Sequence, residues 1–196
     1  TWTYTDACGN PATATQTITV DDTIPPTASN PLPVTVECID GVPEADPAVV
    51  TDEADNCTVA PTVAFVSDVS DNNTCPEVIT RTYSVTDDCL NSINVTQTIT
   101  VNDTIAPVFD TPPADVTVEC SADVPAMTDL GWTDNCDGSG LVTGTDSSDG
   151  KTCPETITRT WTYTDACGNP ATATQTIIVD DTIPPTASNP LPVTVE

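Results

Sequence analysis

Apolar and polar residues alternate with a period of two along most of this chain, which is the pattern of half-buried β-strands. The clearest example is residues 156–164, TITRTWTYT, in which one face carries only threonine. The other face carries Ile157, Arg159, Trp161 and Tyr163. Residues 79–85 repeat the alternation, so we expect two equivalent strands that each pack an apolar face and one arginine against a core.

Turn residues separate the expected strands. The segment DACGN at residues 165–169 lies between two alternating runs, and its Gly and Asn are typical of a hairpin turn. A unit of roughly 80 residues with about six or seven such strands is too small for a large core, and an antiparallel sandwich is the usual solution. We therefore predict an all-β chain of tandem immunoglobulin-like β-sandwich domains, disulfide-bonded and arranged end to end.

Internal repeats organise the chain. Residues 1–37 recur as residues 160–196 with one change, Thr19 becoming Ile178. The motif VTVEC ends at Cys38 and again at Cys120, and a linker resembling VDDTIPP occurs three times. We interpret the chain as a segment of a longer array with these parts: a C-terminal hairpin at 1–22, a first repeat at 23–103, a second repeat at 104–181 and the first strand of a further repeat at 182–196. The alternative is that the two ends complement each other as donor strands.

Charge and composition exclude several functions. The formal net charge of −27 comes from 30 acidic and 3 basic residues, so nucleic acid and anionic lipid are repelled. The sequence has no apolar run long enough to insert into a membrane. Nine cysteines in a chain without histidine indicate disulfides rather than zinc, which places the protein in an oxidising, extracellular space, secreted or at the cell surface.

The disulfide pairing is argued from strand geometry. The strand between Cys153 and Cys167 holds its ends about 30 Å apart, whereas bridged Cα atoms lie within about 7 Å, so those two cannot pair. An immunoglobulin-like strand order places Cys120 with Cys153 at one end of the sandwich, and Cys136 with Cys167 at the other. The expected bonds are Cys120–Cys153 and Cys136–Cys167, and in the first repeat Cys38–Cys75 and Cys57–Cys89. Cys8 is left without a partner.

The succession VTVEC, TDNC, TCPETITRTWTYTDACGN and DDTIPP resembles the four-cysteine variety of hyalin-repeat (HYR-like) modules, which occur in tandem in large secreted and surface proteins of bacteria. The resemblance covers the whole chain. It implies an immunoglobulin-like fold and a role in adhesion or surface architecture, without enzymatic activity. The first repeat departs from the pattern at Leu90, where the second repeat has Gly168.

Acidic residues of the linkers and of the neighbouring loops are expected to meet, because a linker enters the next sandwich beside its upper loops. A cluster of carboxylates repels itself, and Ca²⁺, with about six to eight oxygen ligands, is the natural counterion. The candidate ligands are Asp21, Asp22, Asp55, Asn56, Asp87, Asn91, Asn102, Asp103, Asp134, Asn135, Asp165, Asn169, Asp180 and Asp181. The alternative is that these residues make Asx turns and face solvent.

Other candidate residues carry weaker signals. The motif Asp-Thr-Ile recurs at each linker and matches a bacterial O-glycosylation pattern, which makes Thr23, Thr104 and Thr182 candidate glycan sites. Arg81 and Arg159 are expected to pair with carboxylates at the edge of the core. The chain has no histidine to act as a base near neutral pH and no Gly-rich phosphate loop, so we expect no enzyme activity.

The sequence therefore predicts a structural component of an extracellular bacterial filament or stalk, built from tandem repeats that calcium stiffens. Its partners are then neighbouring repeats of the same chain or fibre, and glycans. The alternative function is an adhesin or ligand-binding spacer module that presents a recognition domain elsewhere.

Overall fold

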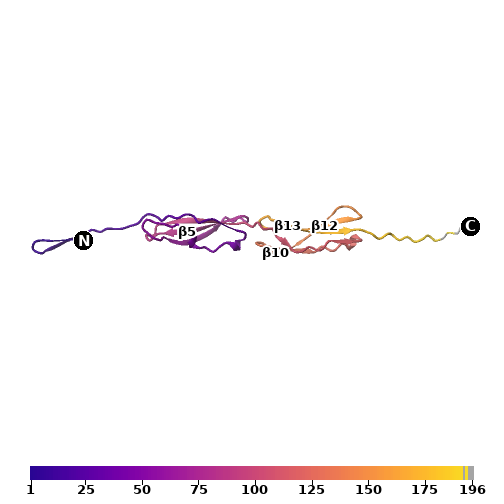
Figure 1. The fold of residues 1–196 in the computed structure, drawn as a ribbon, viewed down its shortest axis with the longest axis horizontal. Helices are drawn as coiled ribbons and strands as arrows, with labels where there is room; N and C mark the ends of the chain where they lie inside the picture. The colour runs from indigo at the N-terminus through magenta and orange to yellow at the C-terminus, as the bar shows by residue number, and fades with distance from the viewer. Residues whose placement is uncertain (192, 194–196) are drawn as a thin grey trace. The chain divides into compact units, whose positions relative to one another are not determined.

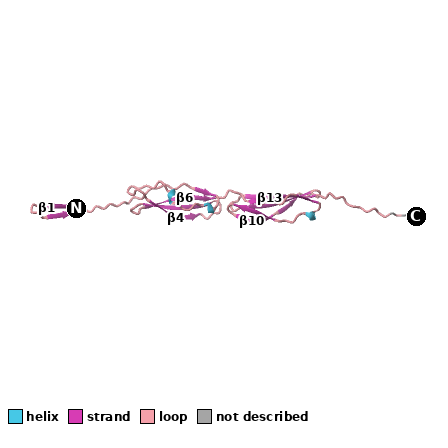
Figure 2. Ribbon diagram, turned by 60° about the horizontal axis from the view of Figure 1, so that its bottom comes forward, coloured by secondary structure: helices cyan, strands magenta, loops and turns pink. Residues whose placement is uncertain are grey.

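The computed structural model describes residues 1–191 and 193. Strands and loops make up these residues, and three short 3-10 turns interrupt them at Ile39–Gly41, Pro47–Val49 and Ser121–Asp123 (Figures 1 and 2). The expected all-β fold class is thus confirmed.

Two compact units divide the chain. Unit 1 consists of Thr1–Val34, Pro43–Ser70 and Ile79–Ile99, and unit 2 consists of Thr35–Val42, Asp71–Val78 and Thr100–Glu196. The repeat boundaries expected from the sequence stay a prediction. Pro192 and residues 194–196, which belong to the first strand expected at 182–196, lie outside the described residues.

The second repeat, within unit 2, contains seven strands in two sheets. One sheet has the order β10 (Gly138–Thr143), β9 (Asp129–Asp134), β7 (Val108–Phe109). The other has the order β11 (Thr145–Ser148), β12 (Glu155–Thr164), β13 (Pro170–Val179), β8 (Val116–Val118). All pairs are antiparallel except β13 with β8, which is parallel. Contacts of β10 with β12 and of β7 with β13 join the sheets, as in an immunoglobulin-like sandwich.

The core of this sandwich lies where the alternation predicts it. On β12, Arg159 and Trp161 are buried, and Trp161 is fully enclosed. Its indole Nε1 donates to the backbone oxygen of Thr128 at 3.0 Å, which satisfies its one polar atom. Tyr163, on the same face, stacks on Trp132 with ring centroids 3.7 Å apart. Both aromatic residues of β12 therefore pack within the domain.

The first repeat has a single four-stranded sheet in the order β3 (Val34–Val36), β6 (Ser92–Val101), β5 (Glu77–Thr86), β4 (Thr62–Ser70). In unit 1 its core cluster is Val50, Tyr83, Val85 and Val95. Opposite this sheet, the described residues pair only through the isolated bridge between Thr27 and Ala54. The first repeat therefore has fewer strands than the six or seven expected.

Residues at the start of the chain form a hairpin of β1 (Trp2–Thr5) and β2 (Pro11–Ala14). Its turn repeats the DACGN motif: Asp6 Oδ1 accepts from the backbone nitrogen of Asn10 at 2.8 Å. The exposed side chains of Trp2 and Tyr4 occupy the positions that Trp161 and Tyr163 hold in the second repeat.

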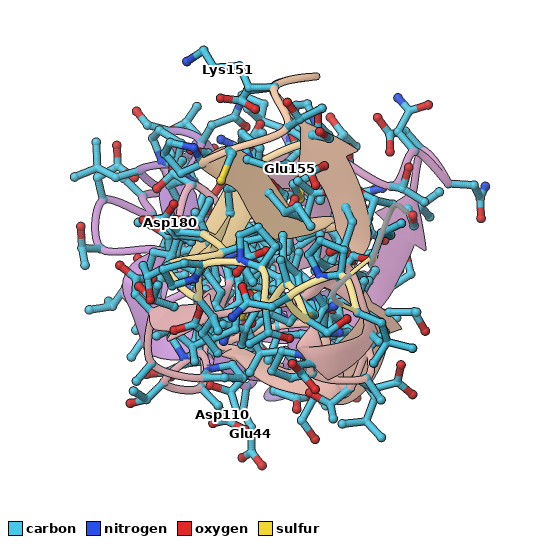
Figure 3. The ribbon with its side chains drawn as sticks, turned by 90° about the vertical axis from the view of Figure 1, so that its right-hand side faces the viewer. Glu44, Asp110, Lys151, Glu155 and Asp180 are labelled. Carbon is cyan, nitrogen blue, oxygen red and sulfur yellow. A yellow bond between two sulfur atoms is a disulfide. The ribbon has the colours of Figure 1, made fainter. Side chains whose placement is uncertain are left out.

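The two buried arginines pair with carboxylates, as the sequence predicts. Arg159 donates from Nε to Asp146 Oδ1 at 2.8 Å and from Nη2 to Asp146 Oδ2 at 2.9 Å. Arg81 forms the same bidentate contact with Asp68, from Nε to Oδ1 at 2.9 Å and from Nη2 to Oδ2 at 2.8 Å. The third basic side chain, Lys151, extends away from the strands, and its ammonium pairs with Asp149 at 3.2 Å (Figure 3).

Leu90 adopts the left-handed conformation that its turn requires. Its φ is 70°, against 92° for Gly168 at the equivalent position. Both turns close with the same backbone hydrogen bond, from Leu90 to Asp87 O and from Gly168 to Asp165 O, each at 3.2 Å. The turn therefore survives the loss of glycine, with the leucine side chain in solvent.

Candidate functional site

Unit 1 contains a cluster of three carboxylates. Asp22 comes from the linker, Asp55 from the loop before β4, and Asp87 from the turn between β5 and β6. One oxygen of each lies within 4.8 Å of the others. Asn56 and Asn91, also expected here, hold the linker: Asn56 Nδ2 donates to Asp22 Oδ1 at 3.4 Å and Asn91 Nδ2 to the Asp22 backbone oxygen at 2.9 Å.

Unit 2 repeats this arrangement around Asp103, which is only 4% exposed. The oxygens of Asp103 and Asp134 lie within 4.8 Å of each other, and of the sulfur of Cys136. Because Cys136 is in a disulfide, its sulfur is not a thiolate and does not serve as a ligand of a hard cation. Asn135 Nδ2 donates to Asp103 Oδ1 at 3.1 Å.

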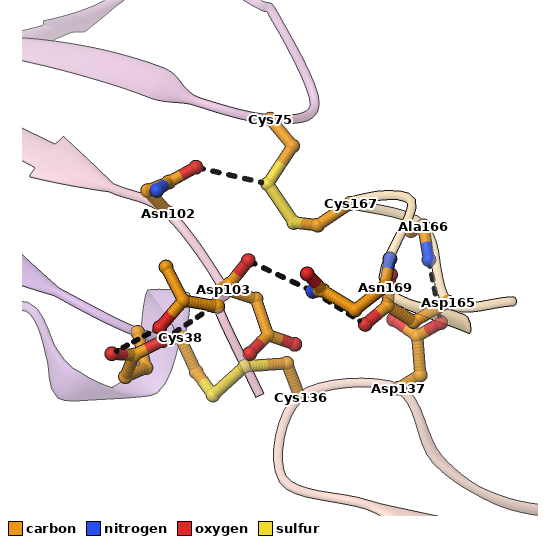
Figure 4. Close-up of a disulfide and its surroundings, with 12 residues drawn as sticks. Cys38, Cys75, Asn102, Asp103, Cys136, Asp137, Asp165, Ala166, Cys167 and Asn169 are labelled. Carbon is orange, nitrogen blue, oxygen red and sulfur yellow. Dashed lines mark hydrogen bonds between the residues drawn. A yellow bond between two sulfur atoms is a disulfide. The ribbon is translucent and has the colours of Figure 1, made fainter. Parts of the chain in front are cut away.

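The turn of residues 165–169 completes the second cluster. Asn169 Nδ2 donates to the Asp103 backbone oxygen at 3.0 Å and to Asp165 Oδ2 at 2.8 Å (Figure 4). Burial raises the pKa of Asp165, but hydrogen bonds from the side chain and backbone of Asn169 outweigh it, so the pKa is lowered overall. Asp165 is therefore held in its charged form although it is buried.

Several carboxylate oxygens in the clusters are buried without a hydrogen-bond partner. They are Asp22 Oδ2 and Asp55 Oδ1 in unit 1, and Asp134 Oδ2 in unit 2. The other oxygen of Asp55 accepts from the backbone nitrogens of Thr58 and Cys57 at 2.7 and 2.8 Å, which lowers the pKa of Asp55. Each cluster thus combines ionised carboxylates with buried oxygens free to accept a positive charge.

Four of the expected ligands lie apart from these clusters. Asp21 and Asp181 are exposed. Asn102 Oδ1 lies 3.6 Å from the sulfur of Cys75, and Asp180 Oδ1 accepts from the Cys153 thiol at 3.6 Å. Asp21, Asn102 and Asp180 precede the cluster position by one residue, and adjacent residues of an extended segment point to opposite faces. Asp181 holds the same position as Asp22 and Asp103, but the described residues place no counterparts of Asp55 and Asp134 beside it.

Asx turns, the alternative interpretation, are also present. Oδ1 of Asp22, Asp103 and Asp181 accepts from the backbone nitrogen two residues later, at 3.1, 3.0 and 3.0 Å. These contacts use one oxygen of each linker aspartate. They leave the second oxygen for another partner.

The disulfide pairing differs from the one expected from the sequence. Cys38 is bonded to Cys136, and Cys75 is bonded to Cys167, with Cα–Cα distances of 5.3 and 5.1 Å (Figure 4). The expected bonds Cys38–Cys75 and Cys136–Cys167 are therefore wrong. Both observed bonds lie in unit 2, and each joins a cysteine of the first repeat to one of the second.

Geometry explains the error. One cavity is lined by all four bonded cysteines, Cys38, Cys75, Cys136 and Cys167. The expectation that Cys38 and Cys75 lie close together at one end of the first repeat is therefore confirmed, although the two are not bonded to each other. Two cysteines of the first repeat and two of the second meet at this cavity, and each bond joins one cysteine of each repeat instead of two cysteines of the same repeat.

The remaining cysteines are free and exposed: Cys8, Cys57, Cys89, Cys120 and Cys153. The expected bonds Cys57–Cys89 and Cys120–Cys153 are thus also absent from the structure. Desolvation and the nearby Asp22 carboxylate raise the pKa of the Cys57 thiol, so this cysteine stays protonated near neutral pH.

Two glutamates that the sequence analysis did not single out hold the linker threonines. Glu37 accepts from the backbone nitrogen of Thr104 at 2.7 Å and from its hydroxyl at 3.1 Å. Glu119 binds Thr182 in the same way, at 2.8 and 2.9 Å. The glutamate of the recurring VTVEC motif was the available signal. Glycosylation of Thr23, Thr104 and Thr182 stays a prediction.

Comparison with known families identifies one part of the chain. Residues 108–179 match the model of the HYR-like domain with 4 cysteines, and this part of the chain is an HYR-like domain. The matched segment contains Cys120, Cys136, Cys153 and Cys167. No curated protein matches the chain.

HYR-like domains are non-enzymatic modules of the adhesion type and are typically extracellular. In the part of the chain that the structure describes, none of the helical segments has the length or apolarity needed to cross a membrane.

Proposed function

We propose that this protein is a structural component of an extracellular bacterial filament or stalk, in which Ca²⁺ bound by the Asp22 and Asp103 clusters stiffens the linkers between repeats. The observation that carries the proposal is the set of buried carboxylate oxygens without partners, among which those of Asp55 and Asp134 belong to equivalent residues of the two clusters. A ligand-recognition surface would require such a site in one repeat only. A site that stiffens linkers is needed at every linker, and each of the two clusters contains a linker aspartate.

Electrostatics favour a cation in these clusters. Two carboxylates about 4 to 5 Å apart repel each other by a few kcal/mol at an effective dielectric constant of about 20. Hydrogen bonds from Asn56 and Asn135 offset only part of this repulsion. Clustered oxygen ligands are the donor set that Ca²⁺ takes, and the anionic charge of each cluster suits a divalent ion.

The mechanism of stiffening follows from the origin of the ligands. Asp22 belongs to a linker, whereas Asp55 and Asp87 belong to loops of the sandwich that follows it. A cation shared by these groups fixes the linker backbone to the loops, in addition to the hydrogen bond from Asn91. Removal of the cation leaves repelling charges at the same place, which loosens the linker.

Calcium binding is tested by thermal unfolding and by calorimetric titration of the chelator-treated chain. Ca²⁺ at about 100 times its dissociation constant stabilises a folded domain by about 2.7 kcal/mol per site, so the unfolding midpoint rises. Small-angle scattering measures the accompanying change in stiffness. Equal midpoints and equal scattering in Ca²⁺ and in chelator would contradict the proposal.

Variants locate the ions. Asp55→Asn and Asp134→Asn remove one charge from each cluster and keep an oxygen acceptor for the turn, and each is expected to weaken Ca²⁺ binding on the order of tenfold at its own cluster. Asp88→Asn is the matched control, because Asp88 lies beside Asp87 but outside the cluster. Equal loss of affinity in Asp88→Asn would show that net charge, not a bound ion, is responsible.

A further inference from the structure

We propose that the free cysteines of the two repeats form disulfides with further repeats of the same kind. Cys120 and Cys153 bond the counterparts of Cys57 and Cys89 in a following repeat, and Cys57 and Cys89 bond the counterparts of Cys120 and Cys153 in a preceding one. Each repeat is then joined to the next by two disulfide bonds. The inference rests on the proposed structural role of the repeats but not on calcium.

The two bonds that the structure contains supply the pairing rule. Cys38 of the first repeat bonds Cys136 of the second, and Cys75 bonds Cys167. In the alignment of the repeats, Cys120 corresponds to Cys38 and Cys153 corresponds to Cys75. Likewise Cys57 corresponds to Cys136 and Cys89 to Cys167. Each free cysteine thus occupies a position at which the other repeat is bonded.

Free and bonded counterparts share their backbone conformation. Cys38 and Cys120 each precede a 3-10 turn, with φ and ψ of −119° and 158° for Cys38 and of −132° and 153° for Cys120. Cys120 is therefore already in the backbone conformation of its bonded counterpart Cys38.

The same holds for the cysteines on the opposite side of the bond. Cys57 and Cys136 each donate a backbone N–H to the aspartate two residues earlier, at 2.8 and 2.9 Å. Each sulfur also lies beside the amide of the preceding asparagine, at 2.9 and 2.8 Å. Cys89 and Cys167 lie in the two equivalent turns that Leu90 and Gly168 close.

Two cavities within unit 2 show what is missing around Cys120 and Cys153. The cavity at the observed disulfides has one wall from the first repeat and one from the second. The first wall includes Glu37, Cys38, Thr74, Cys75, Glu77, Val101 and Asp103. Six of the seven counterparts line another cavity: Glu119, Cys120, Thr152, Glu155, Val179 and Asp181. The seventh, Cys153, lies beside it, with its thiol donating to the backbone oxygen of Asp181 at 3.8 Å.

The second cavity lacks the other wall. At the observed disulfides that wall consists of Cys136, Asp137, Ala166 and Cys167. Among the described residues, the cavity at Cys120 has no lining residue that takes their place. The occupant that fits is a repeat presenting these loops, because it brings two thiols in the spacing at which Cys136 and Cys167 meet their partners.

The bonds form by thiol–disulfide exchange with a disulfide oxidant such as oxidised glutathione. The thiolate of Cys120 attacks the oxidant, one glutathione leaves as a thiol, and a mixed disulfide remains. The partner cysteine then attacks the Cys120 sulfur and releases the second glutathione. The two electrons and the two thiol protons pass to the oxidant, which ends as two molecules of reduced glutathione.

The test uses a tandem chain in which residues 38–196 of a second copy follow Glu196. Because residues 160–196 repeat residues 1–37 with one change, the added copy continues the array in register. After oxidation in a glutathione buffer, peptide mapping is expected to find Cys120 bonded to Cys57 of the added copy, and Cys153 bonded to Cys89 of the added copy. Bonds within one repeat, or free thiols at these four positions, would overturn the inference.

Single substitutions provide matched controls. Cys120→Ser in the first copy is expected to release one alkylatable thiol, at Cys57 of the added copy, whereas Cys8→Ser releases none. The Cys38–Cys136 bond of each copy reports correct folding in the same map. If Cys120→Ser released no thiol, Cys120 would have no covalent partner.

A second arm distinguishes a repeat of the same polypeptide from a separate copy. The 196-residue chain, mixed from unlabelled and ¹⁵N-labelled material and then oxidised, yields isotopically mixed peptides only if copies cross-link. Both results retain the partner as another repeat. All maps are read with Ca²⁺ and with chelator, and the unfolding midpoint is measured in parallel, so failure of the cross-links is separable from failure of calcium binding.

Discussion

Asn169 holds the linker of the second repeat by its backbone, because its Nδ2 donates to the carbonyl oxygen of Asp103 at 3.0 Å. Asn91 makes the equivalent contact with Asp22 at 2.9 Å in unit 1. In both turns the asparagine is itself fixed by an aspartate, Asp165 or Asp87, at 2.8 Å. The turn therefore sets where the linker aspartate lies before any cation binds.

Replacement of this asparagine tests its role in positioning. Asn169→Ala removes the bond to Asp103 and leaves the buried Asp165 carboxylate with one donor fewer, so we expect a loss of about 1–3 kcal/mol in the free energy of unfolding, measured by urea denaturation. Asn10→Ala is the control, because Asn10 lies in the same turn of the exposed β1–β2 hairpin. A loss in Asn10→Ala equal to that in Asn169→Ala would show that the turn alone matters.

The period of two along the chain was sufficient to predict the strands and the buried face of β12, because burial of one sheet face leaves a direct mark on the sequence. The cluster at Asp103 was also predicted. A linker that enters a sandwich lies beside the loops at that edge, and this does not depend on the disulfide pairing or the number of strands. Asp21 and Asp180 were not separated from the cluster position that follows each of them, because two adjacent aspartates look alike until the strand phase at the linker is known.

The disulfide partners and the strand count of the first repeat were not predictable in the same way. Any repeat contains two cysteines at each end, and pairing within a repeat or across to the next satisfies the same spacing. Residues 43–61 carry prolines and acidic residues that do not alternate, so packing against the sheet, rather than a local pattern, decides their conformation.

The Arg159–Asp146 pair makes stability depend on pH. Hydrogen bonds from Arg159 lower the pKa of Asp146 below its usual value, so the folded state holds this carboxylate charged more readily than the unfolded chain. The resulting stabilisation is present above the unfolded pKa of about 3.9 and is lost as pH falls through the lower folded value.

Asp146→Asn is expected to cost about 1–2 kcal/mol at pH 7, a reduced value because solvent screens the partly exposed aspartate. The difference from the unsubstituted chain should shrink as pH falls below about 4, as measured by urea unfolding at each pH. Lys151→Ala breaks an exposed pair and serves as the control, with a change within about 0.5 kcal/mol. A constant difference across this pH range would mean that the charge of Asp146 contributes nothing.

Leu90 gives a prediction of the opposite sign, since its replacement by glycine should stabilise the protein. A non-glycine residue in the left-handed region destabilises the folded state by about 1–2 kcal/mol. Glycine relieves this strain, but its greater flexibility in the unfolded chain offsets about 0.5–1 kcal/mol of the gain. The exposed leucine side chain contributes little packing. Leu90→Gly should therefore raise the free energy of unfolding by about 0.5–1 kcal/mol, and Gly168→Ala should lower it by a similar amount. Thermal and urea unfolding of both variants measure these changes. A less stable Leu90→Gly chain would show that the leucine side chain makes contacts that offset the strain of its backbone.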